Sequence, residues 1–344
     1  MTPDTEHLIW VLQGARAGDN AQARELASQL GWQAMIKPLF FNILHRLPNA
    51  LLGARIASVR RRAAAGLVPP WPDLVIATGK RTAPVARWIK KQSGGRTKIV
   101  QLGRPRAPLA AFDLVVTTPQ YGLPSAANVV EVFLPFATPQ PVEAAALTRW
   151  SAAWSHLPRP WIALVIGAPR KPLRLGDAEI ARLTEATNRL AAASGGSLMV
   201  VGSPRTPQGA AEQIGAGLTA PAILYPWNTA ENPYQAVLAL ADRFVVTSDS
   251  ASMLGETIRT GKPVDIFILP SSRRRLGWQT SARLAAWLSR RGILQPRGDM
   301  LRLVNEIIGR GHARPLGSDL AIQPLTGGVG DDIVVRIKAM FDAP

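Results

Sequence analysis

The stretch ADRFVVTSDSASMLGETIRTGKPV, residues Ala241 to Val264, decides how the second half of the chain folds. Its apolar, β-branched run Phe244–Val246 predicts a short buried strand, and the hydroxyl-rich turn that follows leads into a helix. Gly261 is suited to end that helix, and Pro263 cannot continue it. The helix therefore begins at the carboxyl end of a strand, where its unpaired N–H groups and positive dipole end favour an anion.

This segment carries more polar groups at the start of the helix than capping requires. Ser250 or Ser252 can cap the helix, and Glu256 can complement its dipole. Glu256 follows Ser252 by four residues, so the two share a face, and the carboxylate can accept hydrogen bonds from two ribose hydroxyls. We therefore predict a site for a phosphorylated ligand, with capping alone as the alternative. Its residues here are Ser248, Asp249, Ser250, Ser252, Met253 and Glu256.

The end of the same segment superficially matches a phosphate-binding loop. Gly255 and Gly261 are separated by five residues instead of four, and Pro263 stands where that motif needs a metal-binding hydroxyl. The motif also falls at the end of a helix instead of at its start. We exclude it for these reasons.

Short apolar runs alternate with helical stretches along the whole chain, which predicts parallel sheets covered by helices. The stretch LPFATPQPV, residues 134–142, interrupts the alternation as an extended connector. With 344 residues, the chain is long enough for two domains of about 150 residues each. We expect an α/β protein with two Rossmann-like domains facing a cleft, at residues 1–140 and 141–325, and a C-terminal helix in residues 326–344.

The expected elements can be located by residue. The strands are Leu8–Leu12, Ala34–Leu39, Leu74–Ala77, Ile99–Leu102, Leu114–Thr117, Val129–Phe133, Trp161–Ile166, Leu198–Val201, Ala222–Tyr225, Phe244–Val246 and Val264–Leu269. The helices are Asn20–Leu30, Leu51–Ala64, Ala83–Lys91, Asp177–Ala193, Pro207–Ile214, Pro233–Ala241, Ala251–Thr260, Thr280–Arg290, Met300–Gly309 and Asp331–Phe341.

Basic and small residues follow several of the expected strands, at the edge where parallel sheets bind ligands. In the first half these residues are Gly79, Lys80, Arg81 and Thr82, directly before a helix. In the second half they are Arg170, Lys171, Ser203 and Arg205. Arginine binds phosphate oxygens bidentately, so we predict that the second set holds a diphosphate. The first set reinforces an anion site at a helix start, and under the first of the two functional hypotheses given below it meets the acceptor. A solvated turn is the alternative at each position.

The first expected strand ends in a glycine-containing turn that lacks the complete dinucleotide-binding motif. Gly14 and Gly18 allow a ligand to approach the backbone on the acceptor side. Asp19 is either a helix N-cap or a carboxylate that acts as a general base. It is the catalytic candidate, and Asp249 is its rival.

The charge balance favours an anionic partner. The chain has 40 Lys and Arg against 23 Asp and Glu, a net charge of +17, although a solvated arginine-rich surface explains the same surplus. The segment Lys37–Arg62 mixes apolar and basic side chains, which predicts either a helix lying on an anionic membrane or an amphipathic helix packed on the sheet. Nucleic-acid binding is not expected, because an aromatic-rich basic groove and a known motif are both missing.

Several classes of site are excluded by composition. The chain has no cysteine, so disulfides and thiolate metal sites are impossible. The four histidines lack metal-ligand spacing, and we expect neither a metal nor a cofactor. The N-terminus has no basic region before its apolar stretch, and no apolar run approaches the roughly 18 residues of a membrane span. We expect a cytoplasmic protein, with peripheral attachment at the inner face of the membrane as the further expectation.

Four stretches together resemble the elongated-mitochondria family of fission proteins, in particular its bacterial members of unassigned function. They are GDNAQARELASQLGW, DLVIATGKRTAPVAR, FDLVVTTPQYGLP and the opening stretch ADRFVVTSDSASMLGETIRTGKPV, in the same order along most of the chain. That family is in turn similar to the B-type, two-Rossmann glycosyltransferases. The resemblance implies that Glu256 binds the donor's ribose and that the turn from Ser248 to Ser252 meets the diphosphate.

Two functions follow as hypotheses. The first is a metal-independent glycosyltransferase that binds a nucleotide-diphosphate sugar between its domains and acts on a lipid or envelope acceptor. The second is a non-catalytic, membrane-peripheral adaptor that kept the fold without turnover. Consumption of a nucleotide sugar distinguishes the two. The family name implies mitochondrial division in plants, which we do not transfer to this chain.

Overall fold

The computed structural model describes residues 4–169, 171–204, 206–227, 231–271, 282–293, 298–325 and 330–342. The chain divides into two compact units. Unit 1 contains the chain up to Ala137 together with helices α10 (Ala282–Arg290) and α12 (Asp331–Lys338). Unit 2 begins at Thr138 and includes helix α11 (Met300–Gly309). The sequence placed this boundary between residues 140 and 141, but it assigned α10 to the second domain and treated α12 as a separate helix.

Unit 1 is built on six parallel strands in the order β2-β1-β3-β4-β5-β6, as far as the described residues show. The strands are β1 (Asp4–Gln13), β2 (Trp32–Pro38), β3 (Leu74–Thr78), β4 (Lys98–Leu102), β5 (Leu114–Thr117) and β6 (Val129–Glu131). Their connections include the helices α1 (Ala17–Leu30), α2 (Asn49–Leu52), α3 (Arg61–Ala64) and α4 (Gly79–Gln92) and the 3₁₀ turns η1 (Ile43–Arg46), η2 (Leu109–Ala111) and η3 (Pro119–Tyr121).

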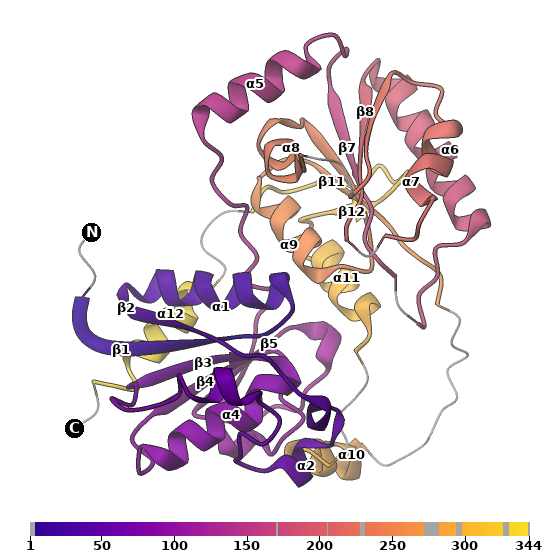
Figure 1. The fold of residues 1–344 in the computed structure, drawn as a ribbon. Helices are drawn as coiled ribbons and strands as arrows, with labels where there is room; N and C mark the ends of the chain where they lie inside the picture. Colours follow the sequence, from indigo (N-terminus) through magenta and orange to yellow (C-terminus); the bar gives the residue numbers. More distant parts are fainter. Residues whose placement is uncertain are drawn as a thin grey trace. The chain divides into compact units, whose positions relative to one another are not determined.

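Both faces of this sheet are covered, which explains why its strands are almost continuously apolar. Ile9 and Val11 of β1 pack with α1 and α12 on one face, while Trp10 and Leu12 pack with α4 on the other (Figure 1). Alternate residues of a strand point to opposite faces, so a single strand supplies both cores. Ile333 of α12 is buried in the first of these cores, which makes the C-terminal helix part of unit 1.

Unit 2 repeats the architecture with strand order β12-β11-β10-β7-β8-β9 in its described part. The strands are β7 (Trp161–Val165), β8 (Ser197–Val201), β9 (Ala222–Tyr225), β10 (Arg243–Thr247), β11 (Val264–Phe267) and β12 (Arg314–Pro315). The connecting helices are α5 (Ala144–Trp154), α6 (Asp177–Ser194), α7 (Ala210–Ala216), α8 (Tyr234–Leu240) and α9 (Ala251–Arg259). Helices α6 and α7 pack on one face of the sheet, over strands β7 and β8 (Figure 1). The prediction of two Rossmann-like domains is confirmed.

Three local predictions differ from the structure. The helix expected at Leu51–Ala64 does not form, because Gly53 ends α2 with a positive φ of 58° and only the four-residue α3 follows. The segment from Lys37 to Arg62 is thus not one amphipathic helix. Helix α5 and strand β12 were not expected at all. Among the described residues, no helix is both long enough and apolar enough to cross a membrane.

Candidate functional site

The strand order of unit 2 locates its ligand-binding edge. The chain runs from β7 outward to β8 and β9, then returns to β10 on the other side of β7 and continues to β11 and β12. The order therefore reverses between β7 and β10. In open parallel sheets, ligands bind outside the carboxyl ends of the two strands at such a switch point. The hydroxyl-rich turn from Ser248 to Ser252 follows β10 directly.

Two hydroxyls of this turn hold the strand ends together. Thr247 is fully buried, and its Oγ1 accepts a hydrogen bond of 2.8 Å from the backbone N–H of Gly167, just after β7. Ser248 is also buried, and its Oγ accepts from the N–H of Leu269 at 3.0 Å. The Ser248 hydroxyl thus has a structural partner, and its contact with a ligand stays a prediction.

Asp249 lies against the backbone at the end of β7. A Cβ atom at Gly167 would lie 2.6 Å from Oδ1 and 2.7 Å from Cγ of Asp249. Real Cβ atoms essentially never come this close, so the carboxylate occupies the space that any other residue at position 167 would need. The switch point of unit 2 is therefore a glycine and a carboxylate in direct contact.

Helix α9 begins next to this contact. Ser250 is its N-cap, and its side chain accepts from the N–H of Met253 at 3.5 Å, which confirms one of the two predicted caps. Ser252 and Met253 lie in the first turn and are half-buried. The other N–H groups of a first helical turn have no partner within the helix, so they are available to an anion.

Glu256 lies one turn further along α9 and pairs with a tyrosine that the sequence analysis missed. The hydroxyl of Tyr234, at the start of α8, donates to Glu256 Oε2 at 2.5 Å. Burial raises the pKa of Glu256, against the opposing effects of the Tyr234 hydrogen bond and the charge of Arg259. Burial and the neighbouring Glu256 raise the pKa of Tyr234 well above its ordinary value. The tyrosine therefore stays a hydrogen-bond donor and orients the carboxylate.

The neighbouring strand ends supply the remaining predicted residues. Ser203, after β8, is buried, and its Oγ lies 2.9 Å from Oγ1 of Thr206, which also donates to the carbonyls of Ile166 and Gly167 at 3.0 Å. Lys171 is exposed. Arg170 and Arg205 lie outside the described residues.

An exposed aromatic residue ends this edge of the sheet. Trp227 follows β9, is 49% exposed, and its backbone N lies 3.6 Å from the Cβ position of Gly202 at the end of β8. Tyr234, Gly167 and Trp227 were all missed in the sequence. Trp227 could have been found, because it is an aromatic residue just after an expected strand, at the edge where ligands bind. Nothing local in the sequence indicates that Tyr234 reaches Glu256.

Unit 1 has its own switch point, between β1 and β3. Asp19, in the first turn of α1, lies 3.8 Å from Nη1 of Arg16. Gly79 begins α4 with a φ of 70°, and its Cβ position would lie 3.9 Å from Asp19 Oδ2. The structure thus brings two predicted acceptor-side residues together.

The other acceptor-side residues differ in accessibility. The turn at Gly14 is closed by Asn20, which accepts from its N–H at 2.9 Å and donates to its carbonyl at 2.8 Å. Lys80 is half-buried, while Gly18 and Arg81 are exposed. Thr82 is buried and its hydroxyl donates to the carbonyl of Thr78 at 2.9 Å, as is common inside a helix. Direct ligand contacts of these residues stay predictions.

Comparison with known proteins relates the chain to one family. The family model described as "Mitochondrial fission ELM1" matches residues 17–303. The "Mitochondrial fission protein ELM1" of Arabidopsis thaliana is 32% identical over 217 residues, which cover 56% of this chain and 51% of that protein. The match thus spans about half the length of the plant relative. The "Uncharacterized protein RP120" of Rickettsia prowazekii is 25% identical over 298 residues, 76% of this chain and 84% of that protein.

Among solved structures, the UDP-GlcNAc 2-epimerase of Methanocaldococcus jannaschii is similar with a TM-score of 0.51. The similarity covers 97% of this chain and 99% of that one, at 9% sequence identity. At this identity, the similarity shows a shared fold and nothing about the reaction.

Proposed function

The chain belongs to the mitochondrial fission ELM1 family, and we propose that it binds a nucleotide-diphosphate sugar at the β7–β10 switch point of unit 2 and transfers the sugar to an acceptor bound by unit 1. One observation carries the proposal: the N-terminus of α9 opens at that switch point, with the oriented Glu256 carboxylate one turn further along the same helix. An anion site and a diol acceptor at this spacing fit a diphosphate followed by a ribose.

The ligand's groups can be assigned to residues of unit 2. The diphosphate lies at the first turn of α9, where Ser252 and the unpaired N–H groups meet its oxygens. Glu256 accepts from the ribose hydroxyls, because each carboxylate oxygen has about two lone-pair sites and Tyr234 uses one of them. Trp227 offers an exposed ring for the base, since stacking needs only an accessible aromatic face.

The transfer step follows from the same groups. The positive end of α9 stabilises the negative charge that develops on the leaving diphosphate, without a metal ion. Asp19 of unit 1 is the proposed general base that accepts the proton of the acceptor hydroxyl. Its position at the β1–β3 switch point supports this assignment.

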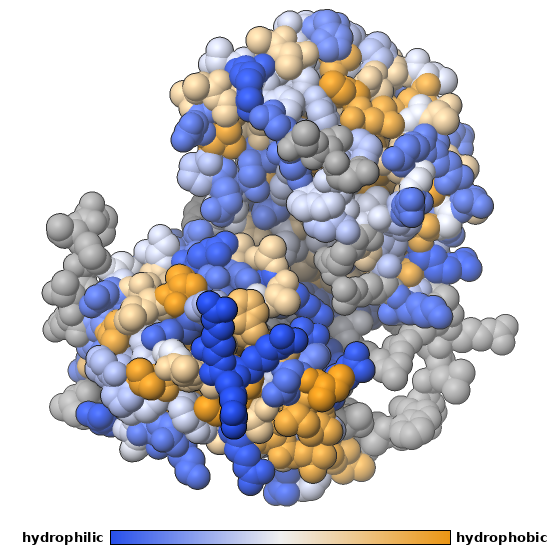
Figure 2. Space-filling model, in the orientation of Figure 1, coloured by the Kyte–Doolittle hydropathy of each residue, from blue (hydrophilic) through white to orange (hydrophobic). Residues whose placement is uncertain are grey.

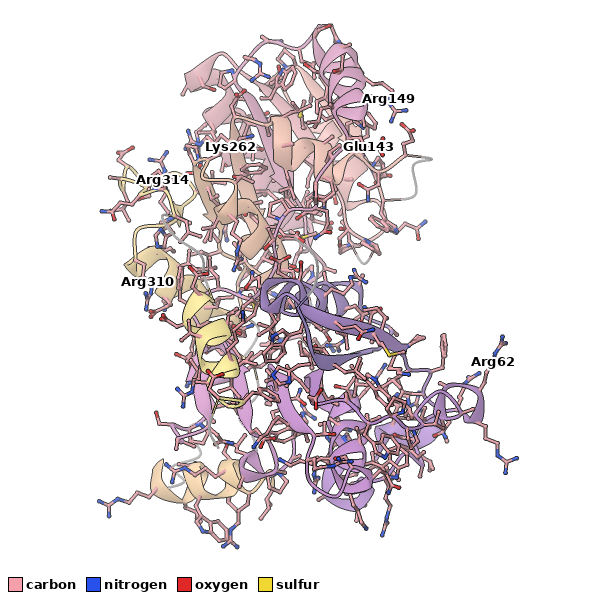
Figure 3. All side chains as sticks on the ribbon, turned by 90° about the vertical axis from the view of Figure 1, so that its left-hand side faces the viewer. Arg62, Glu143, Arg149, Lys262, Arg310 and Arg314 are labelled. Carbon is pink, nitrogen blue, oxygen red and sulfur yellow. The ribbon has the colours of Figure 1, made fainter. Side chains whose placement is uncertain are left out.

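A surface of unit 1 supports peripheral attachment to an anionic membrane. Within the described residues, eight of the fourteen exposed large hydrophobic side chains lie between Met35 and Val68. The same segment contains six Lys and Arg and no Asp or Glu. In Figure 2, apolar side chains gather where Figure 1 labels α2 and α10, with strongly hydrophilic ones beside them, and Arg62 points away from unit 1 in Figure 3. We call residues 35–68 the apolar–basic surface, and we propose an anionic bilayer as its partner.

Nucleotide-sugar binding is tested by a thermal-shift panel of nucleotide-diphosphate sugars. A ligand at a hundred times its dissociation constant stabilises by about 2.7 kcal/mol, which is readily measured. Glu256→Gln should weaken binding about tenfold or more, because hydrogen bonds to a charged group contribute about 1.5–3 kcal/mol. The control is Glu185→Gln, on the exposed face of α6. Equal shifts in both variants would remove Glu256 from the site.

Turnover separates the enzyme from the alternative, a non-catalytic membrane-peripheral adaptor. We expect a nucleotide sugar that binds to be consumed when membrane extract supplies the acceptor, and Asp19→Asn to abolish consumption while nucleotide-sugar affinity is kept. Binding without consumption in any extract would favour the adaptor.

Membrane attachment is tested by co-sedimentation with phosphatidylglycerol vesicles. Replacing Arg60, Arg61 and Arg62 by Gln should reduce partitioning at least tenfold, since each basic residue near an anionic surface contributes about 1 kcal/mol. The matched control is Val335→Ser on α12, which removes an exposed apolar side chain outside the apolar–basic surface. If the arginine variant sediments like the control, this surface does not bind the membrane.

A further inference from the structure

Four neighbouring strands of unit 1 direct charged or aromatic residues to one edge of the sheet. Strands β1, β3, β4 and β5 are adjacent and parallel, so their carboxyl ends lie side by side. Asp19 follows β1, Lys80 follows β3, Arg104 and Arg106 follow β4, and Tyr121 follows β5. The sequence analysis recognised only the first two of these positions.

Two buried amides hold these strand ends close to one another. The Nδ2 of Asn49, a residue only 2% exposed, donates to the carbonyl of Lys80 at 2.8 Å and to that of Pro105 at 2.7 Å. The Nε2 of Gln101, fully buried in β4, donates to the carbonyl of Gly79 at 3.1 Å. One side chain thus bridges the backbone beside Lys80 and the backbone between Arg104 and Arg106.

Two of these cations, Lys80 and Arg104, have no carboxylate partner within 4.0 Å among the described residues. The Nη1 atom of Arg104 is buried without a hydrogen-bond acceptor among those residues. Burial, together with the charges of Arg106 and Arg81, lowers the pKa of Lys80. Burial and the charge of Arg106 likewise lower the pKa of Arg104.

Tyr121 joins the basic residues to Asp19. Its ring lies 5.7 Å from the guanidinium carbon of Arg104 and 3.3 Å from the Cβ position of Gly103. Burial and the Asp19 charge raise the pKa of the Tyr121 hydroxyl, while Arg104 and Arg16 oppose that shift. The hydroxyl therefore stays protonated, and Asp19 lies close to the cations Arg16 and Arg104 that act on the same hydroxyl.

We propose that this edge of unit 1 binds a phosphate group, with Lys80, Arg104 and Arg106 contacting its oxygens, and that the acceptor of the transfer reaction carries that phosphate. That the bound molecule is the acceptor rests on the proposed function, whereas phosphate binding itself involves only unit 1. A phosphate relieves the repulsion among these cations, and the planar guanidinium groups of the arginines favour phosphate oxygens as acceptors. Asp19 then stands beside the phosphorylated molecule.

Two sources can supply this phosphate, a lipid headgroup or a soluble phosphorylated molecule. Lys80 Nζ donates to the carbonyl of Arg46 at 3.2 Å, so the edge is in direct contact with the apolar–basic surface. A lipid headgroup therefore reaches Lys80 without leaving the bilayer that this surface contacts. A soluble phosphate reaches the same groups from solution.

The test is calorimetric titration of the whole chain with inorganic phosphate, inorganic diphosphate and monodisperse short-chain phosphatidic acid. We expect at least one of them to bind, and Lys80→Gln and Arg104→Gln each to lower its affinity about tenfold or more. Arg106→Gln, at an exposed position, should have a similar effect and keeps the test valid if a half-buried variant unfolds. The control is Arg24→Gln, an exposed cation on α1.

The outcomes separate this inference from the proposed function. Stronger binding of phosphatidic acid than of phosphate identifies a lipid headgroup, and equal affinity identifies a soluble source. Phosphate binding that is lost in the three variants, in a protein that binds no nucleotide sugar, supports this site while refuting the proposed function. Equal affinity in Arg24→Gln and Arg106→Gln, or no binding of any probe, overturns the site even if nucleotide sugars bind unit 2.

Discussion

The two units place a glycine and an aspartate together at their switch points, but they use opposite arrangements. In unit 1, Asp19 follows the first strand and Gly79 follows the third, with 3.9 Å between the carboxylate and the glycine's Cβ position. In unit 2, Gly167 follows the first strand and Asp249 follows the fourth, and Oδ1 of the carboxylate lies only 2.6 Å from the glycine's Cβ position. Two parallel six-stranded sheets with different strand orders thus have different switch points, one rich in cations in unit 1 and one closely packed in unit 2.

The difference extends to the chemistry of each edge. Unit 2 presents hydroxyls, a helix N-terminus and a tyrosine-oriented carboxylate, whereas unit 1 presents basic side chains around Asp19 and Tyr121. A helix start with a carboxylate one turn later fits a nucleotide. A cluster of cations fits a phosphate group and selects less strongly for the remainder of the ligand. Two Rossmann-like units therefore need not bind the same ligand, because the residues that follow the strands decide what binds.

The largest expected effect is the loss of stability when a buried carboxylate is removed from the sheet of unit 2. Asp265 of β11 is fully buried and accepts from Arg243 Nε at 2.5 Å and Arg314 Nε at 2.9 Å. Asp265→Ala should lower the free energy of unfolding by about 3–5 kcal/mol, because it leaves two partly buried arginines without a counter-charge.

The matching change in unit 1 is Asp113→Ala, which removes the partner of Lys90. Asp113 is 17% exposed and pairs with one cation, so we expect a smaller loss of about 1–3 kcal/mol. Urea denaturation gives the magnitudes, and hydrogen exchange assigns each loss to its unit. Equal losses would show that the two sheets depend on their buried charges alike.

The next largest effect is the loss of stability when alanine replaces the glycine at each switch point, which has a different cause in each unit. Gly167→Ala should destabilise by about 1–3 kcal/mol, because its Cβ meets the Asp249 carboxylate. Gly79→Ala should cost about 1–2 kcal/mol for another reason, namely the left-handed φ of 70°.

Double variants distinguish these causes. Adding Asp249→Ala should restore most of the stability lost in Gly167→Ala, whereas adding Asp19→Ala should not rescue Gly79→Ala. Thermal unfolding of these four variants and of the single variants Asp249→Ala and Asp19→Ala measures both couplings. Additive losses at the Gly167–Asp249 pair would contradict the contact that distinguishes unit 2.

The smallest expected effect concerns the pH dependence of nucleotide-sugar binding. Burial raises the pKa of Glu256, so the carboxylate that accepts from ribose is lost at a higher pH than for an ordinary glutamate. Affinity should therefore fall as the pH is lowered through that raised pKa. Tyr234→Phe removes the hydrogen bond that opposes the shift, so the midpoint of the loss should move to still higher pH.

The measurement is the dissociation constant of a nucleotide sugar from pH 4 to 8 in the wild type, Tyr234→Phe and Glu256→Gln. The Glu256→Gln variant lacks the titrating group, so its weaker binding should be nearly independent of pH in the acidic range. A midpoint that moves to lower pH in Tyr234→Phe would mean that the tyrosine does not stabilise the ionised form.

Local sequence patterns predicted most of the strands and helices because each depends on neighbouring residues. The run Leu114–Thr117 has the bounds of β5, and Met300–Gly309 has those of α11. The prediction failed at Leu51–Ala64, where helical periodicity did not reveal that Gly53 adopts a positive φ. The assignment of α12 also needed the structure, because its apolar face packs with Ile9 and Val11 of β1, near the other end of the chain.

The candidate site divides in the same way. The sequence by itself determined that hydroxyls and a glutamate follow β10 at the start of a helix, because capping and helical spacing are local properties. Only the tertiary structure decided that Tyr234 reaches Glu256 and that Asp249 fills the space at Gly167. It also decided that Asn49 joins the start of α4 at Lys80 to the loop that carries Arg104. These contacts join residues far apart in the chain, and it is the order of the strands in each sheet that brings them together.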